Sequence, residues 1–300
     1  MIYTVFSTTN NPIMNWESTL LEYSWKQVNQ PGKLIRLLST RNRTQLPSHC
    51  EAQIILTWPW TTHPMTGDRY PVYNKPASLS QWLQLHKPEG TILLIDPDCV
   101  FRAPILQEAM EGHPVGQNWV NLNLDLPYPP TGRPAREIVN RFCRNNRELV
   151  VGVMIPTLIH TIDLKRIMPR WLELTALIRR DVPDQQGNGL WESDMFAYII
   201  AAAEHGLVHE VGNLGICTHW APQDVPNAPI IHYCHPIMSK NQEKIWYKGS
   251  YIPWEDVPAP DLAEHDFGRD LLQLVDRCRK HQLEADSCPD HTSADINLYI

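Results

Sequence analysis

The sequence predicts an α/β protein with an open, largely parallel sheet that is covered by helices on both faces. Short apolar runs alternate with segments of helical periodicity through the first hundred residues. Turn residues such as Pro31-Gly32 separate these segments. The last apolar run of this part ends in Asp96-Pro97-Asp98, and open sheets of this kind bind ligands beyond the carboxyl ends of their strands.

The N-terminal elements follow a regular order. Residues 2–6 form an apolar run that stops at a polar loop, which predicts a buried strand. Trp16, Leu20 and Ser24 have helical spacing, and the helix that they predict ends before Pro31-Gly32. The elements that follow are predicted strands over 33–38, 53–57 and 91–95, and a helix that opens at Pro76 after a loop rich in Trp, Pro and Tyr.

The second half is less regular. Pro169 interrupts the helical pattern that begins at Asp163, so two consecutive helices are expected there. The predicted elements are helices over 134–147, 163–168, 169–180, 190–205 and 263–283, and strands over 149–155, 208–211 and 230–234. Residues 284–300 carry acidic residues and no Lys or Arg, and we expect them to form a mobile tail.

The composition excludes several classes of protein. The 300 residues are 43% hydrophobic and 20% charged, which indicates a globular chain, and the net charge of −7 disfavours a nucleic-acid binder. The seven cysteines include no CxxC pair, so neither a disulfide framework nor a Cys-based zinc site is expected. No apolar run reaches the ~18 residues that cross a bilayer, and the N-terminus lacks the basic segment of a signal peptide. These features predict a cytoplasmic protein without a membrane span.

Asp96-Pro97-Asp98 is the most informative motif. In an extended chain residues i and i+2 point to the same side, and Pro97 favours an extended Asp96, so both carboxylates can face one ligand. Two oxygen ligands suit Mg²⁺ or Mn²⁺, which would hold a diphosphate. The alternative is a capped turn after the strand. His232 ends a short apolar run and is a candidate third ligand, which favours Mn²⁺, with a purely structural histidine as the alternative.

Other charged residues have two interpretations each. Glu192 and Asp194 stand at the front of a predicted helix, where they either satisfy its free N–H groups or face the reacting carbon of a substrate. Lys75 precedes a helix N-terminus and either contacts phosphate or is solvated. The second half also holds an arginine cluster that either binds an anion or forms a solvated helix face, namely Arg133, Arg136, Arg141, Arg144 and Arg147.

Several common sites are excluded by their motifs. The sequence contains no GxGxxG and no GxxxxGK[ST], so classical dinucleotide and P-loop sites are not expected. It also contains no GxSxG and no HExxH, which excludes the usual serine hydrolase and zinc protease signatures.

An ordered set of motifs resembles a known family. The matching stretches are Val5-Phe6-Ser7-Thr8, Trp16-Glu17-Ser18-Thr19-Leu20-Leu21-Glu22-Tyr23-Ser24, Gln30-Pro31-Gly32, Asn74-Lys75-Pro76, Asp96-Pro97-Asp98-Cys99-Val100-Phe101-Arg102-Ala103-Pro104-Ile105, Asp194-Met195-Phe196-Ala197-Tyr198 and Ile231-His232-Tyr233. This layout resembles the GT-A nucleotide-sugar glycosyltransferases. It is most similar to the peptidyl hydroxyproline O-arabinosyltransferase and peptidyl serine α-galactosyltransferase family of plants and algae.

The resemblance implies a single GT-A domain, a Rossmann-like mixed sheet flanked by helices, over residues 1–283. A nucleotide-sugar half would cover about residues 1–105 and an acceptor half about 106–283. The implied activity is a retaining, metal-dependent transfer of galactose or an arabinose-like pentose from a UDP-sugar. The acceptor would be a hydroxyl of a peptide, such as Ser or hydroxyproline, or of a glycan.

The same resemblance assigns roles to residues at the matching positions. The uridine would be bordered by Phe6, Ser7 and Thr8. Asp96 would lie near the ribose and the metal, while Asp98 and His232 would ligate Mn²⁺ or Mg²⁺. Asp194, with Glu192 beside it, would act at the reacting centre, and Lys248 would contact the diphosphate.

Two rival functions use the same residues or the same fold. One is a metal-dependent nucleotide-sugar hydrolase or phosphatase, and the other is a non-catalytic carbohydrate- or protein-binding domain. Asn10-Asn11 stands where the plant and algal relatives usually carry an acidic residue and a cysteine. An acceptor other than a secreted hydroxyproline- or serine-rich protein is therefore an alternative.

Overall fold

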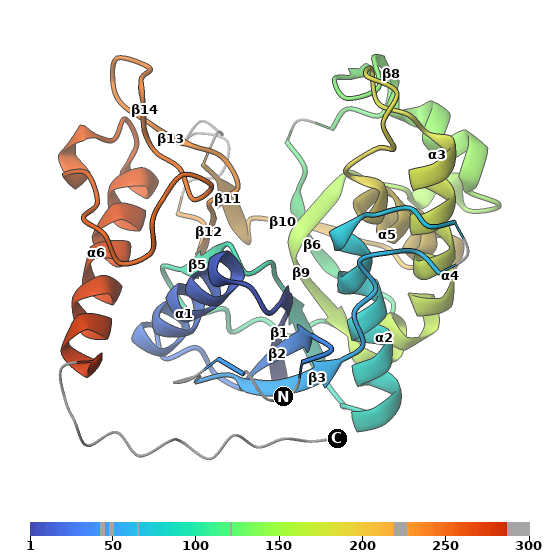
Figure 1. Cartoon of the computed structure of the whole chain (residues 1–300). Coiled ribbons are helices and arrows are strands. Elements are labelled where there is room, and N and C mark those ends of the chain that lie inside the picture. Colours follow the sequence, from blue (N-terminus) through green and yellow to red (C-terminus); the bar gives the residue numbers. More distant parts are fainter. Residues whose placement is uncertain (43–45, 48–50, 65, 121, 219–226, 287–300) are drawn as a thin grey trace.

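A seven-stranded mixed sheet forms the centre of the computed structural model (Figure 1). The structure describes residues 1–42, 46–47, 51–64, 66–120, 122–218 and 227–286. The strand order in the sheet is β10-β6-β9-β4-β1-β2-β3. Residues 287–300, most of the predicted acidic tail, lie outside the described residues.

The N-terminal part of the chain supplies four strands of the sheet that run parallel to one another. They are β1 (Ile2–Thr9), β2 (Lys33–Ser39), β3 (Gln53–Thr57) and β4 (Thr91–Leu94). These strands are mostly buried, as the near-continuous apolar runs predict for strands covered on both faces. Because β1 lies between β2 and β4, the carboxyl ends of all three strands meet at one edge of the sheet.

Three further strands make the sheet mixed. They are β9 (Val153–His160), β6 (Val115–Asn118), which both run antiparallel to a neighbour, and β10 (Glu210–Gly212), which is parallel to β6. The strand expected over 149–155 therefore lies later in the chain, after a 3₁₀ turn, η2 (Arg147–Leu149). Pro156 does not end β9, because the register between β6 and β9 shifts there and the missing N–H is not needed in the ladder.

Helices cover both faces of the sheet. Figure 1 shows two of them on one side, α1 (Pro12–Gln27) and α6 (Asp266–Asp286). The others lie on the opposite side, namely α2 (Asn74–His86), α3 (Ala135–Phe142), α4 (Thr161–Asp181) and α5 (Ser193–Glu204). The coverage predicted from the sequence is therefore confirmed, although α2 begins two residues before Pro76, α3 ends before Arg147 and α6 continues past residue 283.

The expected division of the helix at Pro169 is wrong. Residues Thr161–Asp181 form one helix, and Pro169 lies on its exposed side. Because proline has no N–H, the carbonyl of Lys165 lacks its usual donor within the helix. This carbonyl lies on a side of the helix that water can reach. The opposite side of α4 is buried and packs along α5, and this packing holds the helix together across the proline.

A small second sheet lies beside the first. It consists of β11 (Gly215–Cys217), β12 (Ile230–His232) and β5 (Cys99–Phe101), with β12 in the middle. Two further pairs of strands form small hairpin-like sheets of their own. They are β7 (Pro127–Tyr128) with β8 (Arg133–Pro134), and β13 (Ile237–Met238) with β14 (Lys244–Trp246). One hydrophobic cluster fills the space around the main sheet, and another lies between α1, α6 and the small sheet.

Candidate active site

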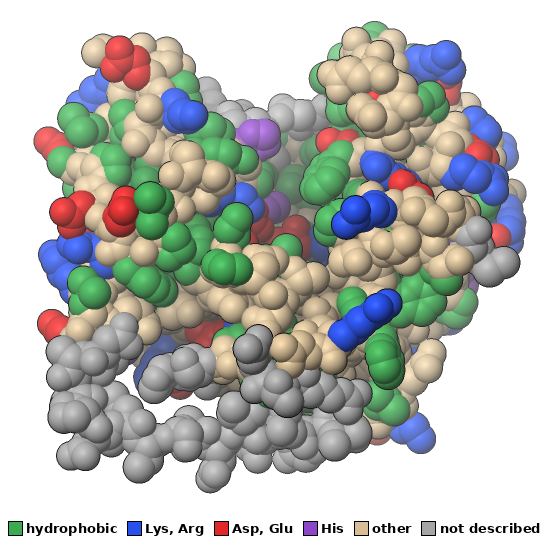
Figure 2. Space-filling model, in the orientation of Figure 1, with side chains coloured by type: hydrophobic (Ala, Val, Ile, Leu, Met, Phe, Trp, Pro, Cys, Tyr) green, Lys and Arg blue, Asp and Glu red, His purple; other side chains and the backbone are tan. Residues whose placement is uncertain are grey.

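A cavity of about 880 Å³ opens at the edge of the main sheet where β1 and β4 end. Figure 2 shows the molecule hollowed between its two sides, with acidic and histidine side chains deep in the hollow. Its walls hold most of the residues that the sequence singles out, namely Ser7, Thr8, Lys75, Asp96, Asp98, Glu192, Asp194, His232 and Lys248. Phe6 is fully buried in the main hydrophobic cluster, just before the cavity wall.

The link between β4 and β5 presents the two aspartates. The N–H of Ile95 donates to the carbonyl of Val5 at 3.1 Å, which fixes the end of β4 beside β1. The N–H of Cys99 then donates to the carbonyl of Asp96 at 3.2 Å, which closes a turn around Pro97. The turn and the ligand-binding interpretations are thus compatible, because Asp96 and Asp98 both line the cavity.

Strand pairing brings His232 to Asp98. In the small sheet His232 lies opposite Cys99, and the N–H of Tyr233 donates to the carbonyl of Asp98 at 2.9 Å. The imidazole Nε2 lies 3.2 Å from Oδ1 of Asp98. Burial alone lowers the pKa of His232, but the neighbouring Cys234 and Asp98 outweigh burial and raise it to about 10.

Lys248 completes this side of the cavity. Its ammonium lies 2.6 Å from Oδ2 of Asp98 and 3.2 Å from Oε1 of Glu17. Burial would raise the pKa of Asp98, but the positive charges of His232 and Lys248 hold it well below its usual range. Asp98 is therefore a buried, charged carboxylate with two cationic neighbours.

A second lysine joins the other predicted acids. The ammonium of Lys75, at the start of α2, lies 3.0 Å from Oδ1 of Asp96 and 3.1 Å from Oδ2 of Asp194. Burial would lower the pKa of Lys75, but Asp194 and Asp96 hold it well above its usual range. Lys75 is thus mostly shielded from water and paired, so its interpretation as a solvated surface lysine is not supported.

The start of α5 points its acidic side chains into the cavity. The hydroxyl of Tyr70 donates to Oδ1 of Asp194 at 3.1 Å, and the indole of Trp171 donates to its carbonyl at 2.8 Å. Glu192 precedes the helix without capping it by a side-chain hydrogen bond, and burial raises its pKa. Asp194 thus lines the cavity with its carboxylate held by Tyr70, and its action on a substrate stays a prediction.

Sequence reasoning did not single out Glu17. It lies on α1 in the cavity wall, is almost fully buried and pairs with Lys248. Burial first, and then Asp98, raise the pKa of Glu17 to about 7. Its position between Trp16 and Leu20 in the sequence could have indicated its role. A charged residue on the inward side of a helix needs a charged partner or a ligand.

The donor set of the cavity fits a hard divalent cation. Among the described residues, Asp98 and His232 offer an oxygen and a nitrogen within 4.8 Å of each other. A carboxylate that stays charged when buried, next to an imidazole, suits Mn²⁺ or Mg²⁺. Asp96 faces Lys75 instead, so the structure brings only part of the predicted set of ligands together.

The arginine cluster lies away from this cavity. Three of its members form exposed ion pairs, Arg136 with Asp125, Arg141 with Asp181 and Arg144 with Glu173. This arrangement agrees with a solvated surface rather than an anion site.

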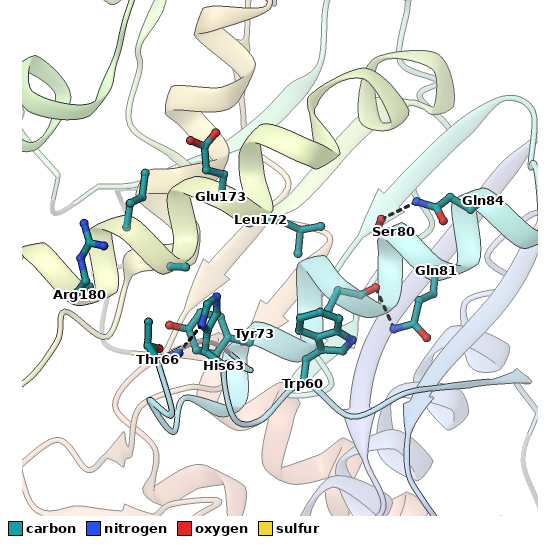
Figure 3. Close-up of a pocket in the computed structure, with 13 residues that line it drawn as sticks. Trp60, His63, Thr66, Tyr73, Ser80, Gln81, Gln84, Leu172, Glu173 and Arg180 are labelled. Carbon is teal, nitrogen blue, oxygen red and sulfur yellow. Dashed lines mark hydrogen bonds between the residues drawn. The ribbon is translucent and has the colours of Figure 1, made fainter.

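A smaller cavity of about 600 Å³ lies between α2 and α4 (Figure 3). Trp60 and His63 of the loop after β3 form part of its lining. Tyr73 of the 3₁₀ turn η1 (Pro71–Tyr73) lines it as well, whereas Pro71 and Val72 line the larger cavity. One short turn therefore separates the two cavities.

The mixed sheet flanked by helices is the fold of the GT-A glycosyltransferases. The chain has the fold of a solved structure described as the apo structure of the WbbM bifunctional glycosyltransferase, with a TM-score of 0.53 and 10% identity. That match covers 94% of this chain and 52% of the other.

Within this class, the chain belongs to the hydroxyproline O-arabinosyltransferase family, because residues 2–211 match the N-terminal domain of that family. The chain is 29% identical over 259 residues to the peptidyl serine alpha-galactosyltransferase of Arabidopsis thaliana, covering 80% of this chain and 31% of that protein. It is 25% identical over 242 residues to the hydroxyproline O-arabinosyltransferase NOD3 of Pisum sativum, covering 76% of this chain and 68% of that protein. The chain thus spans about a third of the length of the galactosyltransferase. No helix among the described residues is long and apolar enough to cross a bilayer.

Proposed function

We propose that the chain is a retaining, metal-dependent glycosyltransferase that moves galactose or a pentose from a UDP-sugar to a hydroxyl of a peptide or glycan. The observation that carries the proposal is one cavity with Asp98 and His232 on one wall and Asp194 on another. The membership of the family and the names of the relatives support sugar transfer to serine or hydroxyproline. The retaining outcome rests on the resemblance alone, and the cytoplasmic location stays a prediction.

The residues of the cavity have different proposed roles in binding the donor. Asp98 and His232 would hold Mn²⁺ or Mg²⁺, which supplies positive charge against the departing diphosphate. Lys248 and Lys75 are permanent cations in the same cavity and can bind phosphate oxygens once their carboxylate partners turn to other ligands. Ser7 and Thr8, at the end of β1, offer hydroxyls to the nucleoside.

Asp194 is the acid best placed to act on the sugar or the acceptor. Tyr70 and Lys75 hold its two carboxylate oxygens, so its orientation is fixed before a substrate binds. The exposed Trp191 lines the same cavity and offers a flat apolar face of the kind that stacks on sugar rings. The acceptor side of the reaction is therefore proposed to lie along the start of α5.

Thermal unfolding with UDP and Mn²⁺ tests the donor site first. A ligand at 100 times its Kd adds about 2.7 kcal/mol to the free energy of unfolding, so the wild-type melting temperature rises clearly. We expect the increase to require both UDP and Mn²⁺ and to vanish in Asp98→Asn. The matched control is Asp125→Asn, which removes an exposed carboxylate outside the cavity and should respond like the wild type.

A panel of UDP-sugars with a serine- and hydroxyproline-containing peptide then tests transfer. Release of free sugar without transfer to the peptide would favour the hydrolase rival. An unchanged melting temperature with every uridine nucleotide would instead favour the non-catalytic binding domain and contradict the proposal.

A further inference from the structure

Two cysteines lie close to His232, and one of them, Cys217, faces the ring nitrogen that does not contact Asp98. Cys217 ends β11, and Cys234 follows β12 by two residues. One ligand atom each from Cys217, His232 and Cys234 lies within 4.8 Å of the others. All three residues line the larger cavity.

The small sheet creates this cluster. β11 and β12 run parallel, with Cys217 directly opposite His232. The Sγ of Cys217 lies 3.9 Å from Nδ1 of His232, and the Cys217 thiol also hydrogen-bonds to Cys234. No CxxC pair marks this cluster, because Cys217 and Cys234 stand 17 positions apart in the chain and the pairing of β11 with β12 brings them together.

The spacing of these atoms matches a tetrahedral zinc site. Zn–S bonds of about 2.3 Å and Zn–N bonds of about 2.0 Å place tetrahedral S and N ligands roughly 3.5 Å apart. The observed 3.9 Å between Cys217 and His232 therefore closes with small rotations of the side chains. Two sulfurs and one imidazole are soft ligands, which prefer Zn²⁺ to Mg²⁺ or Mn²⁺.

The other ring nitrogen of His232 is already oriented for this role. Its Nε2 lies 3.2 Å from the buried Asp98 carboxylate. Zinc-bound histidines commonly donate the second N–H to a carboxylate, which fixes the ring and strengthens the ligand. Asp98 supplies that carboxylate, and the cavity leaves a fourth position open to water.

We propose that Cys217, Cys234 and Nδ1 of His232 form a binding site for Zn²⁺. The site uses neither Asp96 nor Asp98 as a ligand, but it shares His232 with the proposed donor cation. His232 cannot ligate a second cation through Nε2 while that nitrogen donates its proton to Asp98. Zinc and a hard cation at Asp98 are therefore alternatives for this histidine.

Metal binding by the full chain under reducing conditions tests the site. After loading with Zn²⁺ in the absence of Mn²⁺ and Mg²⁺, we expect one Zn²⁺ per chain after gel filtration, and a sulfur-to-metal charge-transfer band when Co²⁺ replaces Zn²⁺. Cys217→Ser and Cys234→Ser should each lose the band. Loss of a ligand's hydrogen-bond partner weakens metal binding by roughly 10–100-fold, and loss of a ligand itself should weaken Zn²⁺ binding by more than that. Circular dichroism checks that the variants fold. If Cys217→Ser does not fold, the Cys234→Ser variant alone tests the site, because Cys234 is partly exposed.

Two controls separate this site from others. Cys143→Ser removes a buried thiol outside the cavity and should keep the band. Asp98→Asn should also keep it, whereas the same variant abolishes the proposed binding of UDP with Mn²⁺. Absence of the band in the wild type would overturn the zinc site, as would its persistence in both cavity cysteine variants or its loss in Asp98→Asn alone.

Discussion

Two partly buried lysines balance the acidic side chains of the cavity. Lys75 contacts Asp96 and Asp194, and Lys248 contacts Asp98 and Glu17. Each ammonium is shared between two carboxylates. Removal of Lys75 takes the lysine partner from both Asp96 and Asp194, whereas Asp98 keeps His232 when Lys248 is removed. The energetic consequence is large, because a buried charge without a partner costs far more than an exposed pair gains.

Lys75→Met should therefore destabilise the protein strongly. We expect a loss of about 3 kcal/mol in the free energy of unfolding at pH 7, measured by urea denaturation. Adding Asp194→Asn should restore part of this loss, because one unpaired charge disappears. The control is Lys26→Met, which breaks an exposed pair with Glu51 and should cost less than about 1 kcal/mol. Equal losses in the two lysine variants would contradict the prediction.

Glu22 predicts a pH dependence of stability. It is buried on α1, where its Oε2 accepts from the N–H of Glu51 at 2.6 Å, and burial raises its pKa from 4.5 to about 7. A raised pKa means that the folded state binds the proton more tightly, so stability falls as the pH rises from about 4.5 to 7. Glu22→Gln removes this ionisation. Its free energy of unfolding relative to that of the wild type should therefore rise by up to about 3 kcal/mol between pH 4 and pH 8.

Urea denaturation at the two pH values measures that gain. The exposed Glu243→Gln serves as the control and should follow the wild type at both. A constant difference between Glu22→Gln and the wild type would show that Glu22 ionises alike in the folded and unfolded protein.

The sequence predicted the part of the site that strand ends supply. Asp96 and Asp98 follow the apolar run of β4, so their position at the carboxyl edge of the main sheet follows from the pattern. The contact of His232 with Asp98 depends instead on the antiparallel pairing of β12 with β5 in the small sheet. Glu17 could not be assigned in this way, because helical periodicity does not tell which element a residue faces. The pairing of Asp96 with Lys75 rather than His232 was equally hidden, since it depends on how α2 docks on the sheet.

At the scale of the elements, a local signal sets the start of α1, whereas packing sets the continuation of α4. Asn11 illustrates the first case, because its Oδ1 accepts from the N–H of Met14 at 2.9 Å and Pro12 opens α1. Pro169 illustrates the second, because α4 continues through it where the sequence predicts a break. The short strands β5, β6 and β11 have three or four residues each, too few for a periodic pattern, and they form because neighbouring strands provide partners.

Asn11→Ala should destabilise the protein by about 1 kcal/mol, because the cap of α1 is lost. Asn11→Asp keeps an acceptor for the N–H of Met14 and should retain most of the stability. Thermal or urea unfolding of the two variants measures the difference. Equal stability of the alanine and aspartate variants would mean that the cap contributes nothing to α1.

At the scale of the whole molecule, the small sheet joins the two hydrophobic clusters. Along β12, Ile230 belongs to the cluster around the main sheet and Ile231 to the cluster beside α6. This is the alternation that a strand imposes, and β5 repeats it with Phe101 and Val100. The cavity lies where the two clusters meet, so its geometry depends on both. The predicted single domain over residues 1–283 implies that the clusters unfold together.

Two core variants test this coupling. Leu174→Ala on α4 lies in the cluster around the main sheet, and Leu271→Ala on α6 lies in the other, and both side chains are fully buried. Each should cost about 2–5 kcal/mol. Because β5 and β12 are shared, each variant should shift one common urea transition, with far-UV circular dichroism and tryptophan fluorescence coinciding. In Leu271→Ala the transition could instead split, so that tryptophan fluorescence changes at a lower urea concentration than the main loss of helix. That result would define the α6 side as a separate folding unit.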